Sequence, residues 1–236
     1  TESDNIAIGY QAMTSNTAGG VQNIALGNYA LDALTSGDDN IAIGHNALTA
    51  TTTGANNIGI GVNTGAANTT GSRNIAIGYE AYDNSDTEDD NIAIGYRAMT
   101  VDTAGGTRNI AIGNYAADAL TSGDNNTIIG HNVASNLTTG GNNVAMGMDA
   151  LLATTTQSNN TAIGYQALRA NTATANTAVG YNALLLNSTG TDNVAVGYEA
   201  LDAQTTGGYN TAIGRSALSA NTDGEKNVAV GGNALA

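Results

Sequence analysis

A five-residue unit of the type Asn-Ile-Ala-Ile-Gly recurs along the whole chain, at intervals of 17 residues apart from two of 18 and one of 16. A period of this length is typical of a solenoid, in which each repeat forms one coil and buries its apolar residues by stacking on its neighbours. Each unit starts at an asparagine and ends four residues later at a glycine. The columns are Asn5, Asn23, Asn40, Asn57, Asn74, Asn91, Asn109, Asn126, Asn143, Asn160, Asn176, Asn193, Asn210 and Asn227, and Gly9, Gly27, Gly44, Gly61, Gly78, Gly95, Gly113, Gly130, Gly147, Gly164, Gly180, Gly197, Gly214 and Gly231.

A second, longer sequence period is superimposed on the first. The string GYQAMTSNTAGG of the first coil returns as GYRAMTVDTAGG in the sixth, and GNYALDALTSGDD returns as GNYAADALTSGDN. The sequence therefore predicts a single repeat domain over residues 1–236, with duplicated five-coil blocks at 5–90 and 91–175 and further coils at 176–236. This arrangement leaves no room for a separate catalytic domain.

Each coil is predicted to run as strand, turn, strand and turn. In segment 6–8, two isoleucines flank an alanine with the period of two expected of a strand, and the following glycine permits a positive φ or a tight bend. A second strand is expected over segment 47–52, with Leu48, Ala50 and Thr52 on one face. A helical interpretation fails because Gly, Asn and Thr recur every few residues and no apolar stripe has a 3.6-residue period.

Stacking of equivalent residues in successive coils explains why the same residue type recurs at each position of a column. Asparagine amides at strand spacing can hydrogen-bond along their column, as they do in cross-β structures. A second column follows twelve residues after each asparagine and is interrupted by Asp86 and Ser188. It consists of Thr17, Thr35, Thr52, Thr69, Thr103, Thr121, Thr138, Thr155, Thr172, Thr205 and Thr222.

The apolar core of such a chain is expected to be thin. There is no Phe or Trp, so the core must be built from Ile, Val, Leu and Ala. The alanine in the middle of most units would let another chain approach closely on that face. We therefore expect an all-β fold, a parallel β-roll or β-solenoid of 14 coils of about 17 residues, in which several identical chains pack side by side.

Charge excludes several classes of partner. The net charge of −14 comes from 20 acidic against 6 basic residues, which cannot neutralise a nucleic-acid backbone. An anionic membrane surface would also repel the chain, and no apolar run has the length of a spanning helix. No signal-peptide pattern follows Thr1. The absence of cysteine fits a secreted protein without disulfides but is equally compatible with the cytoplasm.

Little in the sequence supports catalysis or metal binding. His45 and His131 occupy equivalent places in the two blocks, five coils apart, and are interpreted as surface residues. Without cysteine or a histidine–carboxylate cluster, no zinc site is predicted. The serines are scattered in turns, so no nucleophile–base set is predicted. We expect no catalytic residue, no cofactor and no enzymatic activity.

Acidic residues gather on one expected turn edge. Asp86, Glu88, Asp89 and Asp90 offer oxygen ligands of the kind that calcium prefers, which makes them weak calcium candidates. Their spacing matches neither an EF-hand loop nor the glycine-rich repeat of calcium-binding rolls. The alternative, a solvated edge that keeps the chain soluble, is preferred.

The residue after the invariant glycine varies most, and it is tyrosine in six coils. Tyrosine offers a flat apolar face and a hydroxyl, so this corner could bind sugars or adhere to a surface. Packing between chains at the same corner is the alternative. The six residues are Tyr10, Tyr79, Tyr96, Tyr165, Tyr181 and Tyr198.

The repeat resembles a known family. Asn-[Ile/Val/Thr]-Ala-[Ile/Val]-Gly, followed by a polar pair and Ala, is similar to the head repeat of trimeric autotransporter adhesins of the Yersinia-adhesin type. The string NTAIGYQAL at 160–168 resembles repeats of phage tail fibres. The resemblance covers essentially the whole chain and implies a left-handed parallel β-roll, three chains about one axis and attachment to a surface. The longer coil, and the lack of a neck, stalk or membrane anchor, depart from the adhesin pattern.

These observations lead to an expected function. The chain is interpreted as a non-enzymatic structural and adhesive segment of an extracellular fibre, on a cell surface or a virion. Its expected partners are itself, as a homotrimer or by end-to-end stacking, and a surface receptor or glycan. The alternatives are an ice-binding β-solenoid, suggested by the threonine column, and a self-assembling extracellular filament subunit. The mixed neighbours of that column, such as Ala18, Ser36 and Asp223, weaken the ice-binding alternative.

Overall fold

The computed structural model describes residues 4–16, 18–101 and 105–236, and in these residues it is all-β, without helix. Thr17 and Thr103 of the threonine column lie outside the described residues. Every unit of the repeat forms one strand of three residues. The strands are β1 (Ile6–Ile8), β2 (Ile24–Leu26), β3 (Ile41–Ile43), β4 (Ile58–Ile60), β5 (Ile75–Ile77), β6 (Ile92–Ile94), β7 (Ile110–Ile112), β8 (Thr127–Ile129), β9 (Val144–Met146), β10 (Thr161–Ile163), β11 (Thr177–Val179), β12 (Val194–Val196), β13 (Thr211–Ile213) and β14 (Val228–Val230).

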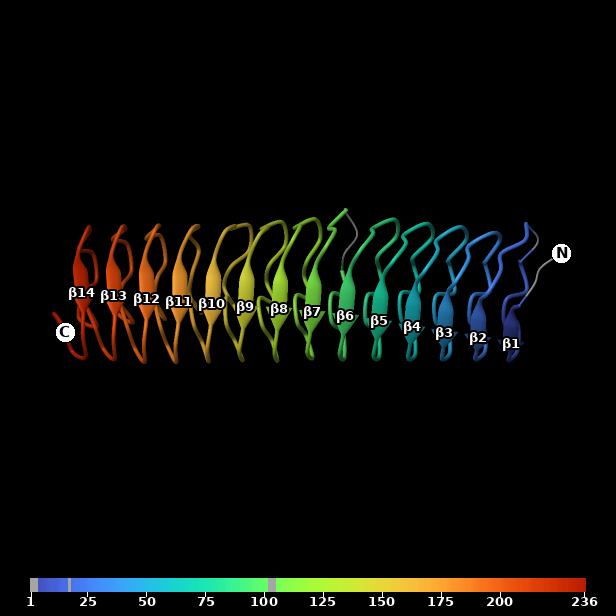
Figure 1. Ribbon diagram of the computed structural model, residues 1–236, viewed down its shortest axis with the longest axis horizontal. Helices are drawn as coiled ribbons and strands as arrows, with labels where there is room; N and C mark the ends of the chain where they lie inside the picture. Colours follow the sequence, from blue (N-terminus) through green and yellow to red (C-terminus); the bar gives the residue numbers. More distant parts are fainter. Residues whose placement is uncertain (1–3, 17, 102–104) are drawn as a thin grey trace. The chain divides into compact units, whose positions relative to one another are not determined.

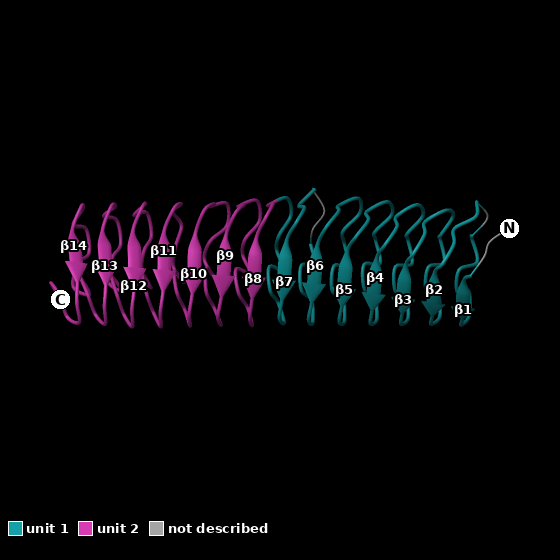
Figure 2. Ribbon diagram, viewed as in Figure 1, with its two compact units in different colours: residues 1–122 teal, residues 123–236 magenta. Residues whose placement is uncertain are grey.

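The chain divides into two compact units, residues 1–122 with β1–β7 and residues 123–236 with β8–β14 (Figure 2). Within each unit, every strand pairs in parallel with the next strand along the sequence (Figure 1). The register places equivalent residues opposite each other, as with Ala76 and Ala93. The predicted parallel β-solenoid is confirmed. The division after Ser122 does not coincide with a boundary of the predicted five-coil blocks, and the single repeat domain stays a prediction.

The core lies between the strand and the second segment of each coil. The middle residue of the strand is buried in β2–β14, and so in most coils is the alanine–leucine pair that follows the next turn, such as Ala47 and Leu48. Two departures from alanine in the strands fit this packing. A Cβ on Gly59 would lie 2.8 Å from Cγ of Leu48, so the glycine leaves room for the leucine. In β8 the larger Ile128 is accompanied by Ala134 in the place of the leucine, which keeps the packed volume similar.

The alanine column does not face another chain, so the expectation that it would is wrong. From β2 onward the middle alanines of the strands are buried inside the coil, whereas the residues on either side of them point outward and stay partly or largely exposed. The reason is the alternation of a strand, because only one face of each three-residue strand can meet the narrow interior. The interior has room for the small residue, so the large aliphatic pair is left outside.

The predicted second strand is also wrong. Segment 47–52 is a turn segment rather than a strand. Leu48 adopts the left-handed region, with φ of 50°, as does Asn46 just before the segment, with φ of 56°. The backbone N–H of Leu48 still donates to the carbonyl oxygen of Thr64 in the next coil at 2.9 Å. Leu48 and Thr51 are buried, whereas Ala50 and Thr52 are partly exposed, so the expected shared face does not form. Each coil therefore has one short strand and one stacked turn segment.

The asparagine column joins and closes the coils. The backbone N–H of Asn40 donates to Oδ1 of Asn23 in the preceding coil at 2.9 Å, and Nδ2 of Asn40 donates to the carbonyl oxygen of Gly54, at the end of its own coil, also at 2.9 Å. The same pattern recurs in both units. Direct amide-to-amide bonds, which the sequence predicted, occur between some neighbours only, such as Asn143 and Asn126. The column is structural, but the backbone is its main partner.

The glycine and threonine columns have structural roles as well. All fourteen invariant glycines have positive φ, between 119° and 144°, which confirms the predicted role of this position. Threonine hydroxyls donate to backbone carbonyls of the next coil, for example Thr52 to Thr69 and Thr138 to Thr155, both at 3.0 Å. These bonds hold successive turn edges together.

Candidate functional site

The first candidate surface is the outer sheet face, formed by the first and third residues of every strand. In β1–β7 these residues are all isoleucine, apart from Leu26. In β8–β14 they are valine, isoleucine and methionine with four threonines, Thr127, Thr161, Thr177 and Thr211. No charged residue belongs to the outer sheet face. Within each unit this gives an exposed and mostly apolar surface, and such a surface marks an interaction site more often than a passive one.

The sequence analysis missed the outer sheet face, although a signal for it was present. Both flanking positions of each strand are filled by β-branched or other large residues, and the position between them is filled by alanine in all strands except β4, with Gly59, and β8, with Ile128. A narrow, closely packed interior accepts one small residue of each strand more readily than the large pair. The size contrast between the two faces could therefore have indicated which face points inward.

The second candidate surface is the tyrosine corner, defined as the six tyrosines that follow an invariant glycine. In residues 123–236, the Tyr165 and Tyr181 rings stack at 5.1 Å between centroids, and Tyr181 stacks on Tyr198 at the same distance. The interplanar angles are 12° and 7°. The Arg215 guanidinium lies 5.7 Å from the Tyr198 ring centroid and covers that end of the stack.

The tyrosine corner of residues 1–122 has two groups of rings. Tyr79 and Tyr96 stack at 5.4 Å with an interplanar angle of 9°, whereas Tyr10 meets the ring of Tyr29 edge to face. All these rings are partly or largely solvent-exposed. Because the faces of stacked rings cover one another, a ligand at the corner would meet mainly ring edges and hydroxyls. The Glu80 carboxylate next to Tyr79, through a hydrogen bond and its negative charge, raises the pKa of the phenol.

Comparison with protein-family models, with curated proteins and with solved structures found no match for this chain. The fold and the two surfaces therefore have to be interpreted from their own geometry. Over the described residues, no helix has the length and apolar character that crossing a bilayer requires.

The calcium candidates do not converge on a common point. Glu88 is buried, and its carboxylate accepts hydrogen bonds from Ser85 Oγ at 2.8 Å and from two backbone N–H groups of its own turn. Asp89 and Asp90 both bond to Arg73, at 3.0 and 2.5 Å. Asp86 accepts a hydrogen bond from the hydroxyl of Thr69. The cluster is thus partnered by donors of this chain, and no group of three or more metal-ligating side chains forms among the described residues.

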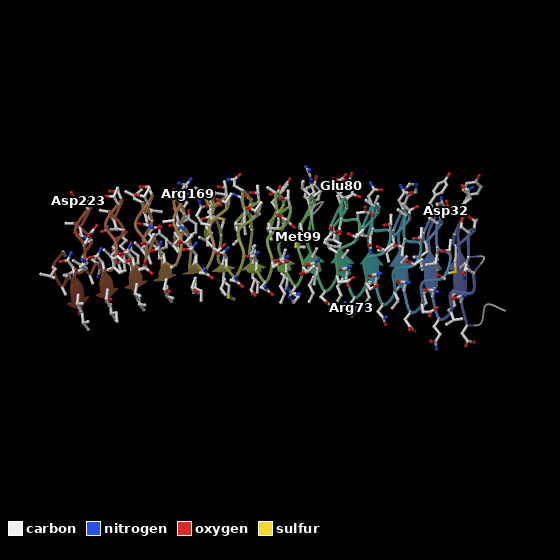
Figure 3. All side chains as sticks on the ribbon, turned by 90° about the horizontal axis from the view of Figure 1, so that it is seen from above. Asp32, Arg73, Glu80, Met99, Arg169 and Asp223 are labelled. Atoms are coloured by element: carbon white, nitrogen blue, oxygen red, sulfur yellow. The ribbon has the colours of Figure 1, made fainter. Side chains whose placement is uncertain are left out.

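The acidic turn edge and the tyrosine corner lie on opposite sides of the unit formed by residues 1–122. Figure 3 shows Arg73, which marks the acidic edge, and Glu80, which follows Tyr79, on opposite sides, with Met99 in the interior between them. The Arg73 guanidinium lowers the pKa of the Asp90 carboxyl through a hydrogen bond and its positive charge. His45 and His131 are both exposed, as expected, and belong to different units.

A carboxylate near the tyrosine corner provides a pH-dependent prediction. Burial, and then the negative charge of Glu199, raise the pKa of Asp202, whose Oδ1 is buried without a hydrogen-bond partner. The folded state therefore binds this proton more tightly than the unfolded state, and its stability falls as pH rises through and above the ordinary range of an aspartate. We expect Asp202→Asn to raise Tm by about 1–2 °C at pH 7 and to leave it unchanged near pH 3. The exposed Asp192→Asn serves as the control, and a gain in Tm for Asp202→Asn that persisted at pH 3 would contradict this assignment.

Proposed function

We propose that this chain is a non-enzymatic structural and adhesive segment of an extracellular fibre, of the kind found in bacterial surface adhesins and phage tail fibres. In this proposal identical chains, three about a common axis, pack side by side through the outer sheet face. The coils are left-handed, and the fibre belongs to a cell surface or a virion. The supporting observation is the outer sheet face, a double column of outward side chains that are large and aliphatic throughout β1–β7 and mostly apolar, with four threonines, in β8–β14.

A second copy of the chain is the occupant that best fits this face. The outer sheet face repeats with the strand spacing of about 4.8 Å, so a partner must have the same repeat to fill it evenly, and an identical chain has it. The charge distribution also permits the contact. The net charge of −14 would keep identical chains apart, but no charged residue lies on this face. The chains can therefore meet there without burying like charges.

The tyrosine corner is the surface that we assign to adhesion. It stays outside the proposed interface, because it lies beyond the glycine that ends each strand. Exposed ring edges, hydroxyls and the neighbouring Glu80 and Glu199 could bind the hydroxyl groups of a glycan or a polar surface receptor. Tyrosine is also enriched in protein interfaces, so a protein receptor would fit the same surface.

The proposed assembly is tested by placing charge on the outer sheet face. Met146 and Ile163 belong to neighbouring strands, and 37% and 36% of their surface is exposed, so lysine can replace both without opening the core. We expect the double variant Met146→Lys/Ile163→Lys to lower the oligomer mass measured by light scattering to that of a monomer. At the expected interface, each buried and unpaired charge costs on the order of several kcal/mol.

The matched control is Thr156→Lys, which adds the same charge on an exposed turn away from the outer sheet face. It should leave the oligomer mass unchanged, and circular dichroism should show that both variants remain folded. A wild-type chain that is a stable monomer at micromolar concentration, or a double variant with the wild-type mass, would overturn the proposed assembly.

The ice-binding alternative receives less support. An ice-binding column needs hydroxyls that are free to order water, whereas the threonine hydroxyls donate to carbonyls of the next coil, as Thr35 and Thr205 do. We therefore expect the purified chain to show no thermal hysteresis. A clear hysteresis that survives the lysine substitutions would favour the ice-binding function instead.

A further inference from the structure

We infer that Tyr165, Tyr181 and Tyr198 form a modification site, at which a one-electron oxidant joins the rings of adjacent coils by a carbon–carbon bond. The oxidant is of the peroxidase class, with hydrogen peroxide as co-substrate. The product is a dityrosine that covalently cross-links two coils of one chain. This inference does not depend on the proposed fibre, because all three rings belong to the same unit of a single chain.

The geometry of the stack supports coupling within the chain. The rings lie 5.1 Å apart between centroids and within 12° of parallel, so small side-chain rotations bring the carbons next to the hydroxyl-bearing carbons of adjacent coils together. The exposed fractions are 36%, 44% and 45%, so the rings can rotate within nanoseconds and an oxidant can reach them. Holding two reactants in this arrangement makes their reaction effectively unimolecular.

The coupling step balances without any group that the proposal does not name. Each of two phenols loses one electron and its hydroxyl proton, which gives two phenoxyl radicals. The radicals form one bond between their ortho carbons, and the hydrogens on those carbons move to the oxygens, which restores two phenols. The two electrons and two protons that were removed reduce one hydrogen peroxide to two waters.

The composition leaves few competing sites of oxidation. The chain has no Cys and no Trp, and its oxidisable residues are ten tyrosines, four methionines and two histidines. Tyr209 lies in the same unit and is more exposed than any ring of the stack, at 60%, but it does not belong to the column. If exposure alone determined the reaction, Tyr209 would react first. If stacking determines it, the column will react with itself.

The experiment treats the whole chain with peroxidase and hydrogen peroxide, then denatures and digests it with trypsin. Cleavage after Arg169 and Arg215 separates residues 109–169 from 170–215, so a Tyr165–Tyr181 bond links these two peptides, whereas a Tyr181–Tyr198 bond closes a loop within the second. Mass spectrometry of the fragments locates each bond. An equal mixture of ¹⁵N-labelled and unlabelled chains distinguishes bonds within a chain from bonds between chains.

We expect linked peptides of unmixed isotope composition, and we expect Tyr181→Phe to reduce the yield of both bonds at least about tenfold, because phenylalanine keeps the stack but cannot form a phenoxyl radical. Tyr198→Phe should remove only the loop, and the control Tyr209→Phe should change neither yield by more than about twofold. The inference is overturned if mixed-isotope links predominate, if Tyr209 forms most of the bonds, or if Tyr181→Phe leaves the linked peptides intact.

Discussion

Replacing Gly180 by alanine is expected to lower the free energy of unfolding by about 3 kcal/mol or more. Gly180 has a φ of +141°, which an L-residue rarely adopts, and a Cβ there would lie 2.2 Å from the carbonyl oxygen of Gly197 in the next coil. Neither backbone can move away without breaking the hydrogen bonds between the coils. Strain and overpacking therefore add, at about 1–3 kcal/mol each. Chemical denaturation followed by circular dichroism measures the loss.

Two other glycines separate the contributions of strain and clash. Gly19 also has a positive φ, +96°, but a Cβ there would have no atom within 4 Å beyond its chain neighbours, so Gly19→Ala should cost only about 1 kcal/mol. Gly232 has neither constraint, and Gly232→Ala should be neutral within about 0.5 kcal/mol. Equal losses at Gly180 and Gly19 would show that the close approach of neighbouring coils contributes nothing.

Replacing Asn193 by leucine is expected to cost about 2–5 kcal/mol, although leucine has a similar size and is more apolar. Asn193 is fully buried. Its Oδ1 accepts the backbone N–H of Asn210 at 3.0 Å, and its Nδ2 donates to the carbonyl oxygen of Gly207, also at 3.0 Å. Leucine leaves the backbone N–H of Asn210 buried without a partner, at about 1–3 kcal/mol. The Gly207 carbonyl keeps Gln204 Nε2 as a donor, so the loss of its bond to Asn193 adds only about 0.5–1.5 kcal/mol. The midpoint of denaturant unfolding checks this value.

Asn136 provides the control, because its side chain is exposed although it also donates to a carbonyl, that of Leu152 at 2.8 Å. Water can replace this bond, so Asn136→Leu should cost less than about 1 kcal/mol. If the two substitutions had the same effect, the asparagine column would not be the link between coils that its hydrogen bonds indicate.

The repeat, its strand and its columns could be predicted from the sequence because they depend on local patterns. The period fixed the number of coils, the alternation in segment 6–8 indicated the strand, and the glycine that follows it indicated a positive φ. The asparagine column was also recognised as structural. The backbone partner of these side chains could not be predicted. Any residue has a backbone N–H, so the sequence shows that the asparagine recurs and not what it bonds to.

The second segment could not be assigned from its alternation alone, because stacked turns and a strand both place alternate residues on one side. A different signal was available. The residues equivalent to Asn46, Leu48 and Asn56 have positive φ in every coil, and β-branched residues are absent from all three columns. The outward positions of the strands, in contrast, are mostly isoleucine, valine and threonine. Since β-branched residues avoid the left-handed region, their exclusion is a marker of this backbone.

The candidate site was predicted only in part. The six tyrosines of the corner are exposed, and their role as a binding surface stays a prediction. The stacking of their rings depends on side-chain rotamers that no pattern specifies. The outward face was assigned to the alanines instead of the large flanking residues, because alternation by itself shows which residues share a face and not which face points inward. The size contrast between the two faces is the signal that distinguishes them. Which face points inward is decided by the width of the interior, a property of the closed coil as a whole.

The hydrogen bonds of the asparagine column, which close each coil and join it to the next, determine how such a chain can change in length. Within a unit, each asparagine donates its backbone N–H to the side-chain oxygen of the preceding asparagine and offers its own side-chain oxygen to the next, as Asn57, Asn74 and Asn91 do in turn. A whole coil can therefore be inserted or removed by recombination between repeats, and no backbone group at the junction loses its partner. The solenoid can therefore vary in length in steps of one coil, while the hydrogen bonds between neighbouring coils stay the same.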